Sequence, residues 1–83
     1  MYSIEFIVHA QKEFKQLSRD DQLRVISVLE RVRMRPHDFS LRLSGSRAYR
    51  VRAGDLRIIM DIIEAEERIV ILKIGNRENV YIP

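Results

Sequence analysis

Residues 47–62, RAYRVRAGDLRIIMDI, have the pattern of a β-hairpin. Apolar and polar side chains alternate on both sides of Gly54 and Asp55, and a glycine followed by one further residue is a preferred two-residue hairpin loop. Such a loop pairs Ala53 with Leu56 and fixes which side chains face each other along both strands. The apolar side chains then lie on one face of the hairpin and the arginines on the other.

Three arginines share the polar face of this hairpin. The pairing places Arg52 directly across from Arg57, and Arg50 across from Ile59. Like charges at facing positions cost up to about 1 kcal/mol, so a fold under no other demand would place an acid at one of them. Solvated surface arginines are the plain alternative. We interpret the cluster as a site that holds an anion such as phosphate.

The rest of the chain predicts an α+β fold with the order β-α-α-β-β-β. Helices followed by a run of strands indicate a helical hairpin that covers one face of an antiparallel sheet of three to four strands, with the other face exposed. The expected strands span residues 2–8, 47–53, 56–63, 68–75 and 79–82, and the expected helices span residues 10–17 and 18–34.

The second helix carries clear signals for its start and its buried face. Ser18 is the expected N-cap, and acidic residues follow it in the first turn, where the helix dipole favours them. Pro36 prevents the helix from continuing. The expected apolar stripe consists of Leu23, Ile26, Leu29 and Val32, widened by Val25 and Val28.

The composition also indicates an anionic partner. The chain has 83 residues and a net charge of +3, and its 15 basic residues are three lysines and 12 arginines. A planar guanidinium group matches phosphate oxygens better than an ammonium group does. A thermally adapted surface is the alternative explanation of this bias. Because there is no cysteine, disulfides and thiolate metal sites are excluded, and we expect neither a metal nor a cofactor.

The sequence predicts a single domain over residues 1–83, located in the cytoplasm. The length is that of one small domain. The first residues, MYSIEFIV, lack the basic region and the long apolar core of a signal peptide. No apolar run is long enough to span a bilayer, so no membrane partner is expected.

The chain resembles the RelE family of toxins from type II toxin–antitoxin systems, in the RelE/ParE superfamily. The resemblance covers nearly all of the chain and rests on the order of its elements and on three motifs. These are Leu43-x-Gly45, then Tyr49-Arg50-Val51-Arg52-x-Gly54-x-x-Arg57, then Gly75-x-Arg77-x-x-x-Tyr81. It implies a small β-sheet with two N-terminal helices.

The resemblance also implies an activity and partners. Well-studied members cut mRNA in the ribosomal A site and are silenced by an antitoxin encoded beside them. We therefore expect a ribosome-dependent mRNA endoribonuclease that inhibits translation, with the ribosome and mRNA as partners and a RelB-like antitoxin bound in a hetero-oligomer. The family's catalytic positions correspond to Arg50, Arg52, Arg57, Arg77 and Tyr81, and Arg42 and Arg47 are expected to bind the RNA.

Three departures from the family pattern affect this expectation. Several bacterial members carry lysine where this chain has Arg50 and Arg52. An aromatic residue often precedes the return-strand arginine, where this chain has Leu56. Many members have a final helix that moves when the antitoxin binds, whereas this sequence stops at Pro83.

The chemistry of RNA cleavage fits this residue set in part. Attack by the 2′-hydroxyl on the adjacent phosphorus needs no metal, but it needs a base, an acid and positive donors. The arginines supply donors and are poor bases, so Tyr81 is expected to transfer a proton or stack on a base. His9 and His37 lie outside the cluster and are interpreted as surface or capping residues. The ribosome is expected to bend the mRNA into the attack geometry.

Three alternatives stay open at this point. ParE-like gyrase inhibitors share the fold and often the return-strand arginine, but tend to lack the concentrated basic set. A non-catalytic nucleic-acid-binding module would use the same arginines for phosphates only. An inactive toxin homologue would serve as an antitoxin partner. The apolar residues Ile59, Ile63 and Ile82 are candidate contacts for an antitoxin.

Overall fold

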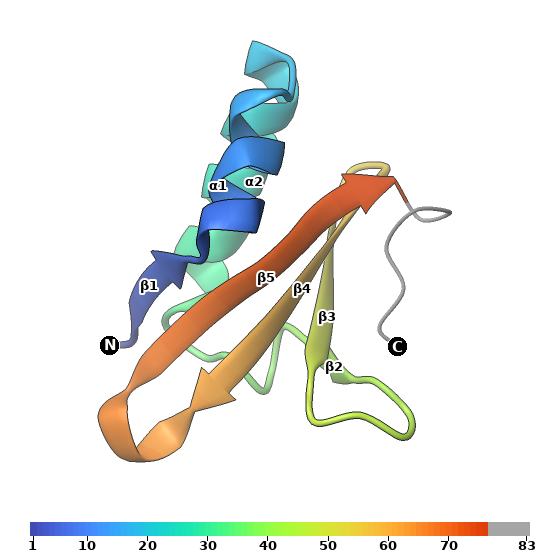
Figure 1. Cartoon of the computed structure of the whole chain (residues 1–83). Coiled ribbons are helices and arrows are strands. Elements are labelled where there is room, and N and C mark those ends of the chain that lie inside the picture. The colour runs from blue at the N-terminus through green and yellow to red at the C-terminus, as the bar shows by residue number, and fades with distance from the viewer. Residues whose placement is uncertain (77–83) are drawn as a thin grey trace.

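The computed structural model describes residues 1–76, which form a five-stranded sheet with two helices on one of its faces (Figure 1). The strand order is β1-β5-β4-β3-β2, with β1 parallel to β5 and the other neighbours antiparallel. The elements are β1 (Ser3–Phe6), α1 (Val8–Lys15), α2 (Arg19–Val32), β2 (Leu41–Arg42), β3 (Tyr49–Ala53), β4 (Leu56–Ile63), the 3-10 helix η1 (Glu64–Glu66) and β5 (Arg68–Asn76).

This architecture confirms the predicted α+β fold, but the sheet differs in its strands. β1 joins the edge of the sheet, where Ile4 lies beside Ile69 and Phe6 beside Ile71. The helical hairpin is a long enough connection for a parallel pairing, which alternation within the first strand does not reveal. β2 has two residues, too few to show a period. The predicted strand 79–82 lies outside the described residues.

The main core lies between the helices and one face of the sheet. From the sheet it takes Ile58, Met60, Ile69 and Ile71, each with no exposed surface, and from α1 it takes Ala10. Because the central strands β4 and β5 share their longest pairing here, the sheet face is a continuous apolar floor for both helices.

The predicted stripe of α2 was partly wrong. The buried residues are Val25, Val28, Leu29 and Val32, whereas Leu23 and Ile26 keep 54% and 46% of their surface exposed. The valine set has spacing i, i+3, i+4, i+7, which is a complete helical face. The two apolar stripes overlap in sequence, and packing against β3 selects the one with smaller side chains.

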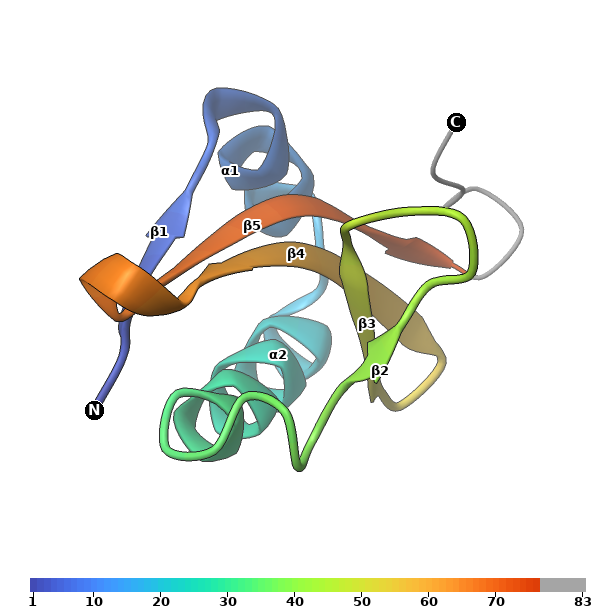
Figure 2. The same cartoon turned by 90° about the horizontal axis from the view of Figure 1, so that it is seen from below.

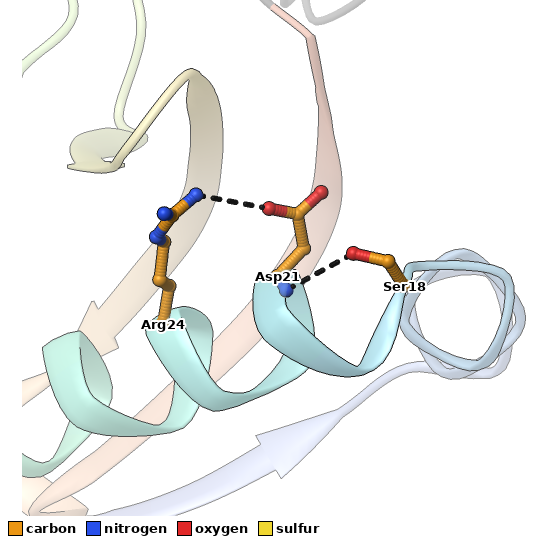
Figure 3. Close-up of polar contacts among 3 residues, drawn as sticks. All are labelled: Ser18, Asp21 and Arg24. Atoms are coloured by element: carbon orange, nitrogen blue, oxygen red, sulfur yellow. Dashed lines mark hydrogen bonds and ion pairs between the residues drawn. The ribbon is translucent and has the colours of Figure 1, made fainter.

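The start of α2 confirms the predicted cap. Ser18 is the N-cap, and its hydroxyl oxygen accepts a hydrogen bond from the backbone N–H of Asp21 at 3.2 Å (Figure 3). Asp20 and Asp21 occupy the first turn, where carboxylates stabilise the positive end of the helix. Neither helix in the described part of the chain is long and apolar enough to cross a membrane.

The second face of the sheet carries a small core of its own, which corrects the expectation that it is fully exposed. A β-bulge in β5 leaves Leu72 without a partner between the pairs Ile59–Lys73 and Met60–Ile71. Ile59, only 1% exposed, is buried with Ala48, and Leu43 and Leu72 pack against them. The loop between β2 and β3 therefore lies against this face (Figure 2).

This small core also corrects one expected antitoxin contact. Ile59 is buried, because the loop that precedes β3 covers it, and it is not available to a partner. Ile63 is half-buried at the end of β4. The third candidate, Ile82, lies outside the described residues.

The turn between β3 and β4 lies beside α2. Gly54 has a φ of +64°, as the first central residue of a Gly-X turn requires, while the φ of Asp55 is not positive. A Cβ at Gly54 would lie 3.2 Å from Cδ of Arg24, whose guanidinium is 3.4 Å from Oδ1 of Asp21 (Figure 3). The turn and the first part of α2 are therefore in contact through the Arg24 side chain.

Replacing Gly54 with alanine is expected to lower the free energy of unfolding by about 1–2 kcal/mol. Alanine adopts a positive φ only at a cost, and its Cβ would also displace Arg24. Gly45→Ala is the matched control, because Gly45 has a φ of +71° and no neighbouring atom lies within 4 Å of the Cβ position. Urea denaturation measures both losses. A loss at Gly45 as large as the loss at Gly54 would contradict a role for the Arg24 contact.

Candidate functional site

The hairpin register places three arginines on the face of the sheet away from the helices. Arg52 pairs with Arg57, and Arg50 pairs with Ile59, as the sequence predicts. Val51 and Ala53 alternate with these arginines on β3 and are buried in the main core. We call Arg50, Arg52 and Arg57 the arginine face.

Five acids of residues 1–76 form ion pairs with arginines other than Arg50 and Arg52. Asp21, Glu30 and Asp38 each form an ion pair with an arginine three residues away in the sequence. Glu5 and Glu66 both pair with Arg68. Within residues 1–76, no carboxylate pairs with Arg50 or Arg52, and no hydrogen bond holds either guanidinium. The acid on the same face of β4 is Asp61, one row beyond Ile59. The positive charges of Arg50 and Arg52 are therefore left for a ligand.

Burial differs among the three arginines. Arg52 is exposed, while Arg50 and Arg57 are half-buried. Arg57 lies across from Gly75 of β5, a residue with no side chain to cover it. An anion can thus approach the exposed Arg52 from solvent, with the half-buried Arg50 and Arg57 beside it.

Sequence reasoning missed one cation of this face. Lys73 of β5 pairs with Ile59, which in turn pairs with Arg50, so Lys73 and Arg50 belong to one row across three strands. The register of β5 depends on the bulge at Leu72, and an unbroken apolar run gives no sign of such a bulge. The sequence contains one sign that Lys73 belongs to the site, which is that it is the one charged residue in the apolar run from Ile69 to Ile74.

The two arginines expected to bind RNA are placed differently. Arg42 pairs with Tyr49, whose side chain packs on the main core, and its Nε donates a 3.3 Å hydrogen bond to the carbonyl oxygen of Ser46. By this register Arg42 is on the opposite face from Arg50. Arg47 is exposed in the loop before β3, on the segment that covers the small core. The structure thus brings neither residue into the row of Arg52 and Arg57.

Neither histidine belongs to the arginine face. His9 lies 3.4 Å from Glu13 on α1, and His37 lies 3.4 Å from Glu64 and packs edge-on against Tyr49, with ring centroids 5.2 Å apart. Both positions agree with the interpretation of surface residues. Arg77 and Tyr81, the other two predicted site residues, lie outside the described part of the chain.

Within this surface, the chemistry on offer is phosphate binding rather than proton transfer. Guanidinium groups donate several hydrogen bonds in a plane and stabilise the charge that grows on phosphate oxygens during displacement. Leu56, at the position where the resemblance predicts an aromatic residue, is 4% exposed and faces the helices. The hairpin itself therefore presents no aromatic ring on the arginine face.

Comparisons with known proteins give a family and a fold. The family model described as ParE toxin of type II toxin–antitoxin system, parDE, matches residues 4–81. A search of curated protein sequences gave no match.

Among solved structures, the toxin–antitoxin complex RelBE of E. coli matches with a TM-score of 0.81 at 20% identity, covering 95% of this chain and 100% of that one. The RelBE2 complex of Mycobacterium tuberculosis gives 0.83 at 18%, covering 94% and 93%. The archaeal RelE–RelB complex of Pyrococcus horikoshii gives 0.75 at 23%, covering 95% and 98%. These similarities show that the fold is RelE-like.

Replacing Arg52 with glutamate is expected to raise the free energy of unfolding by about 0.5–1 kcal/mol, because a facing like-charge pair becomes an opposite-charge pair. Arg52→Gln should give a smaller gain. Arg50→Glu is the control, since Arg50 faces the apolar Ile59 and has no such repulsion to relieve. Urea denaturation at low salt measures all three variants. If Arg52→Glu destabilised the protein as much as Arg50→Glu, the facing arginines would not be under strain.

Proposed function

This chain belongs to the family of ParE toxins of type II toxin–antitoxin systems, in the RelE/ParE superfamily, and within it we propose that the protein is a ribosome-dependent mRNA endoribonuclease. The single observation that carries the proposal is the arginine face. Arg50, Arg52 and Arg57 lie in adjacent rows of one hairpin, and the acids of residues 1–76 leave Arg50 and Arg52 without partners. A surface that concentrates guanidinium groups in this way suits a phosphodiester.

The proposed reaction needs no group outside protein, RNA and ribosome. The 2′-hydroxyl oxygen attacks the adjacent phosphorus, the bond to the 5′-oxygen breaks, and the products are a 2′,3′-cyclic phosphate and a 5′-hydroxyl. The proton lost by the 2′-hydroxyl is balanced by one gained at the leaving oxygen. The arginine face binds the phosphate oxygens and stabilises the charge that develops on them.

The remaining roles rest on the resemblance. Arg77 assists at the phosphate, and Tyr81 transfers a proton or stacks on a base. Arg42 and Arg47 contact the RNA chain outside the reacting phosphate, because neither belongs to the row of Arg52 and Arg57. These residues offer many hydrogen-bond donors for phosphate oxygens but few groups that can act as an acid or a base. The ribosome therefore contributes by holding the 2′-oxygen in line with the scissile bond.

A RelB-like antitoxin is the proposed partner. Two of the similar solved structures are complexes of RelE with RelB. By analogy, the antitoxin forms a hetero-oligomer with this chain in the cytoplasm. An acidic segment of such a partner would neutralise Arg50 and Arg52, which have no acidic partner within residues 1–76.

Gyrase inhibition is the second candidate, because the matching family model describes ParE toxins of parDE systems. This function would use Arg57 and the shared fold without needing the full arginine face. The two candidates differ in their product, which is a cleaved message in one case and a broken chromosome in the other. An inactive homologue that only binds antitoxin would give neither product.

Arg52→Ala and Arg57→Ala are each expected to slow ribosome-dependent mRNA cleavage by about a hundredfold or more, as loss of a transition-state donor does. The measurement maps 5′ ends on a message translated with purified ribosomes. His9→Gln and His37→Gln are the controls and should cleave like the parent. Circular dichroism and urea denaturation show whether each variant is folded.

An assay of double-strand DNA breaks, run beside this mapping of 5′ ends, separates the candidates. Unchanged cleavage by folded Arg52→Ala and Arg57→Ala would reject the assignment of these arginines. Double-strand DNA breaks without codon-level cleavage of mRNA would reject the ribonuclease function and support gyrase inhibition. Absence of both products from the parent protein would leave the inactive homologue.

A further inference from the structure

An exposed aromatic ring lies beside the arginine face, in the loop between α2 and β2. Phe39 keeps 45% of its surface exposed. The loop is held in shape by its own hydrogen bonds, since the backbone N–H groups of Asp38 and Phe39 both donate to the carbonyl oxygen of Arg35, at 3.1 and 3.3 Å. The hydroxyl of Ser40 donates to the carbonyl oxygen of Pro36. The ring is therefore presented by a fixed turn.

Two surface hollows meet at this ring. One, of about 480 Å³, is lined by residues 38–41 and by Arg50, Val51 and Arg52 of β3. The other, of about 340 Å³, is lined by Val28, Arg31 and Val32 of α2 together with Phe39, Val51 and Arg52. Phe39, Val51 and Arg52 line both hollows, so the two hollows adjoin at these residues, and Arg52 has no ion-pair or hydrogen-bond partner within residues 1–76.

The chemistry of these hollows matches a nucleotide. Their lining combines the aromatic Phe39, the apolar Val51 and the three arginines Arg31, Arg50 and Arg52. The acid in the lining, Asp38, already pairs with Arg35 at 3.4 Å. Proteins that recognise single-stranded RNA stack bases on aromatic rings and hold the neighbouring phosphates with cations.

The hairpin does not supply such a ring itself. Leu56 is buried against the helices, and Tyr49 packs on the main core and against His37. We infer that Phe39 is the stacking platform for a nucleobase of single-stranded RNA whose adjacent phosphate is bound by Arg50 and Arg52. This inference rests on the proposed function, because it names a base-binding residue of the same site.

A tryptophan at position 39 provides a direct probe. The sequence contains no tryptophan, so Phe39→Trp would be the only indole in the protein, and its fluorescence would report stacking at this ring alone. The probes are a single-stranded hexaribonucleotide and the same strand with abasic sugars. Quenching by the normal strand and its loss with the abasic strand are expected. Leu23→Trp, at an exposed apolar position that lines neither hollow, is the control and should not be quenched.

Binding affinities provide the second readout. Phe39→Leu keeps an apolar side chain but removes the ring, and it should weaken hexaribonucleotide binding roughly tenfold, as loss of one base–aromatic stack does. Phe39→Tyr should restore parent affinity. Equal affinity of Phe39→Leu and the parent would overturn the inference, as would equal quenching by normal and abasic strands. Quenching by a deca-glutamate peptide and not by RNA would also overturn it and assign these hollows to a protein strand.

The outcome is separable from that of the proposed function. Quenching of Phe39→Trp by the normal strand in a protein that cleaves no mRNA would uphold the stacking site and reject the enzyme. Loss of cleavage in Arg52→Ala together with unchanged RNA binding by Phe39→Leu would uphold the enzyme and reject the stacking site.

Discussion

The two-residue turn at Gly54 and Asp55 is the constraint on which the site depends. A positive φ at Gly54 closes the hairpin with Ala53 opposite Leu56, and from that pair every facing position of β3 and β4 follows. A slip of one residue would turn the arginines into the core and the core residues into solvent. The burial of Val51, Ala53 and Ile58 against the helices therefore holds the arginine face in register as firmly as it holds the fold.

The positive charge of the arginine face depends on where the acidic residues of the described chain lie. Most ion pairs join residues close in sequence on α2 or at the edge formed by β1 and β5, and pairs of this kind on the surface contribute little stability. They engage five carboxylates with arginines other than Arg50 and Arg52. A protein with a modest net charge can in this way keep a concentrated positive surface at one place, where it meets an aromatic ring and an apolar floor.

Local patterns predicted the local structure. The cap at Ser18, the turn at Gly54 and the facing pair Arg52–Arg57 follow from one or two residues each, and the structure confirms them. Long-range features could not be predicted in this way. The parallel pairing of β1, the bulge at Leu72 that aligns Lys73 with Arg50, and the rotation of α2 that exposes Ile26 all depend on how distant elements pack. The position of Phe39 could not be predicted for the same reason. It lies in a loop whose sequence has no hydrophobic periodicity, and only the folding of the chain brings it beside Arg50 and Arg52.

The parallel edge strand has a consequence for synthesis of the protein. Ser3 pairs with Arg68 and Phe6 with Ile71, so the two strands that complete the sheet are separated by nearly the whole described chain. Contacts so far apart in sequence form slowly, since the loop between them must close first. During translation β1 is synthesised long before β5 and cannot pair until β5 has left the ribosome. Until then the helical hairpin also lacks the β5 part of the apolar sheet face against which it packs. The sheet is therefore completed only after β5 has been synthesised and pairs with β1.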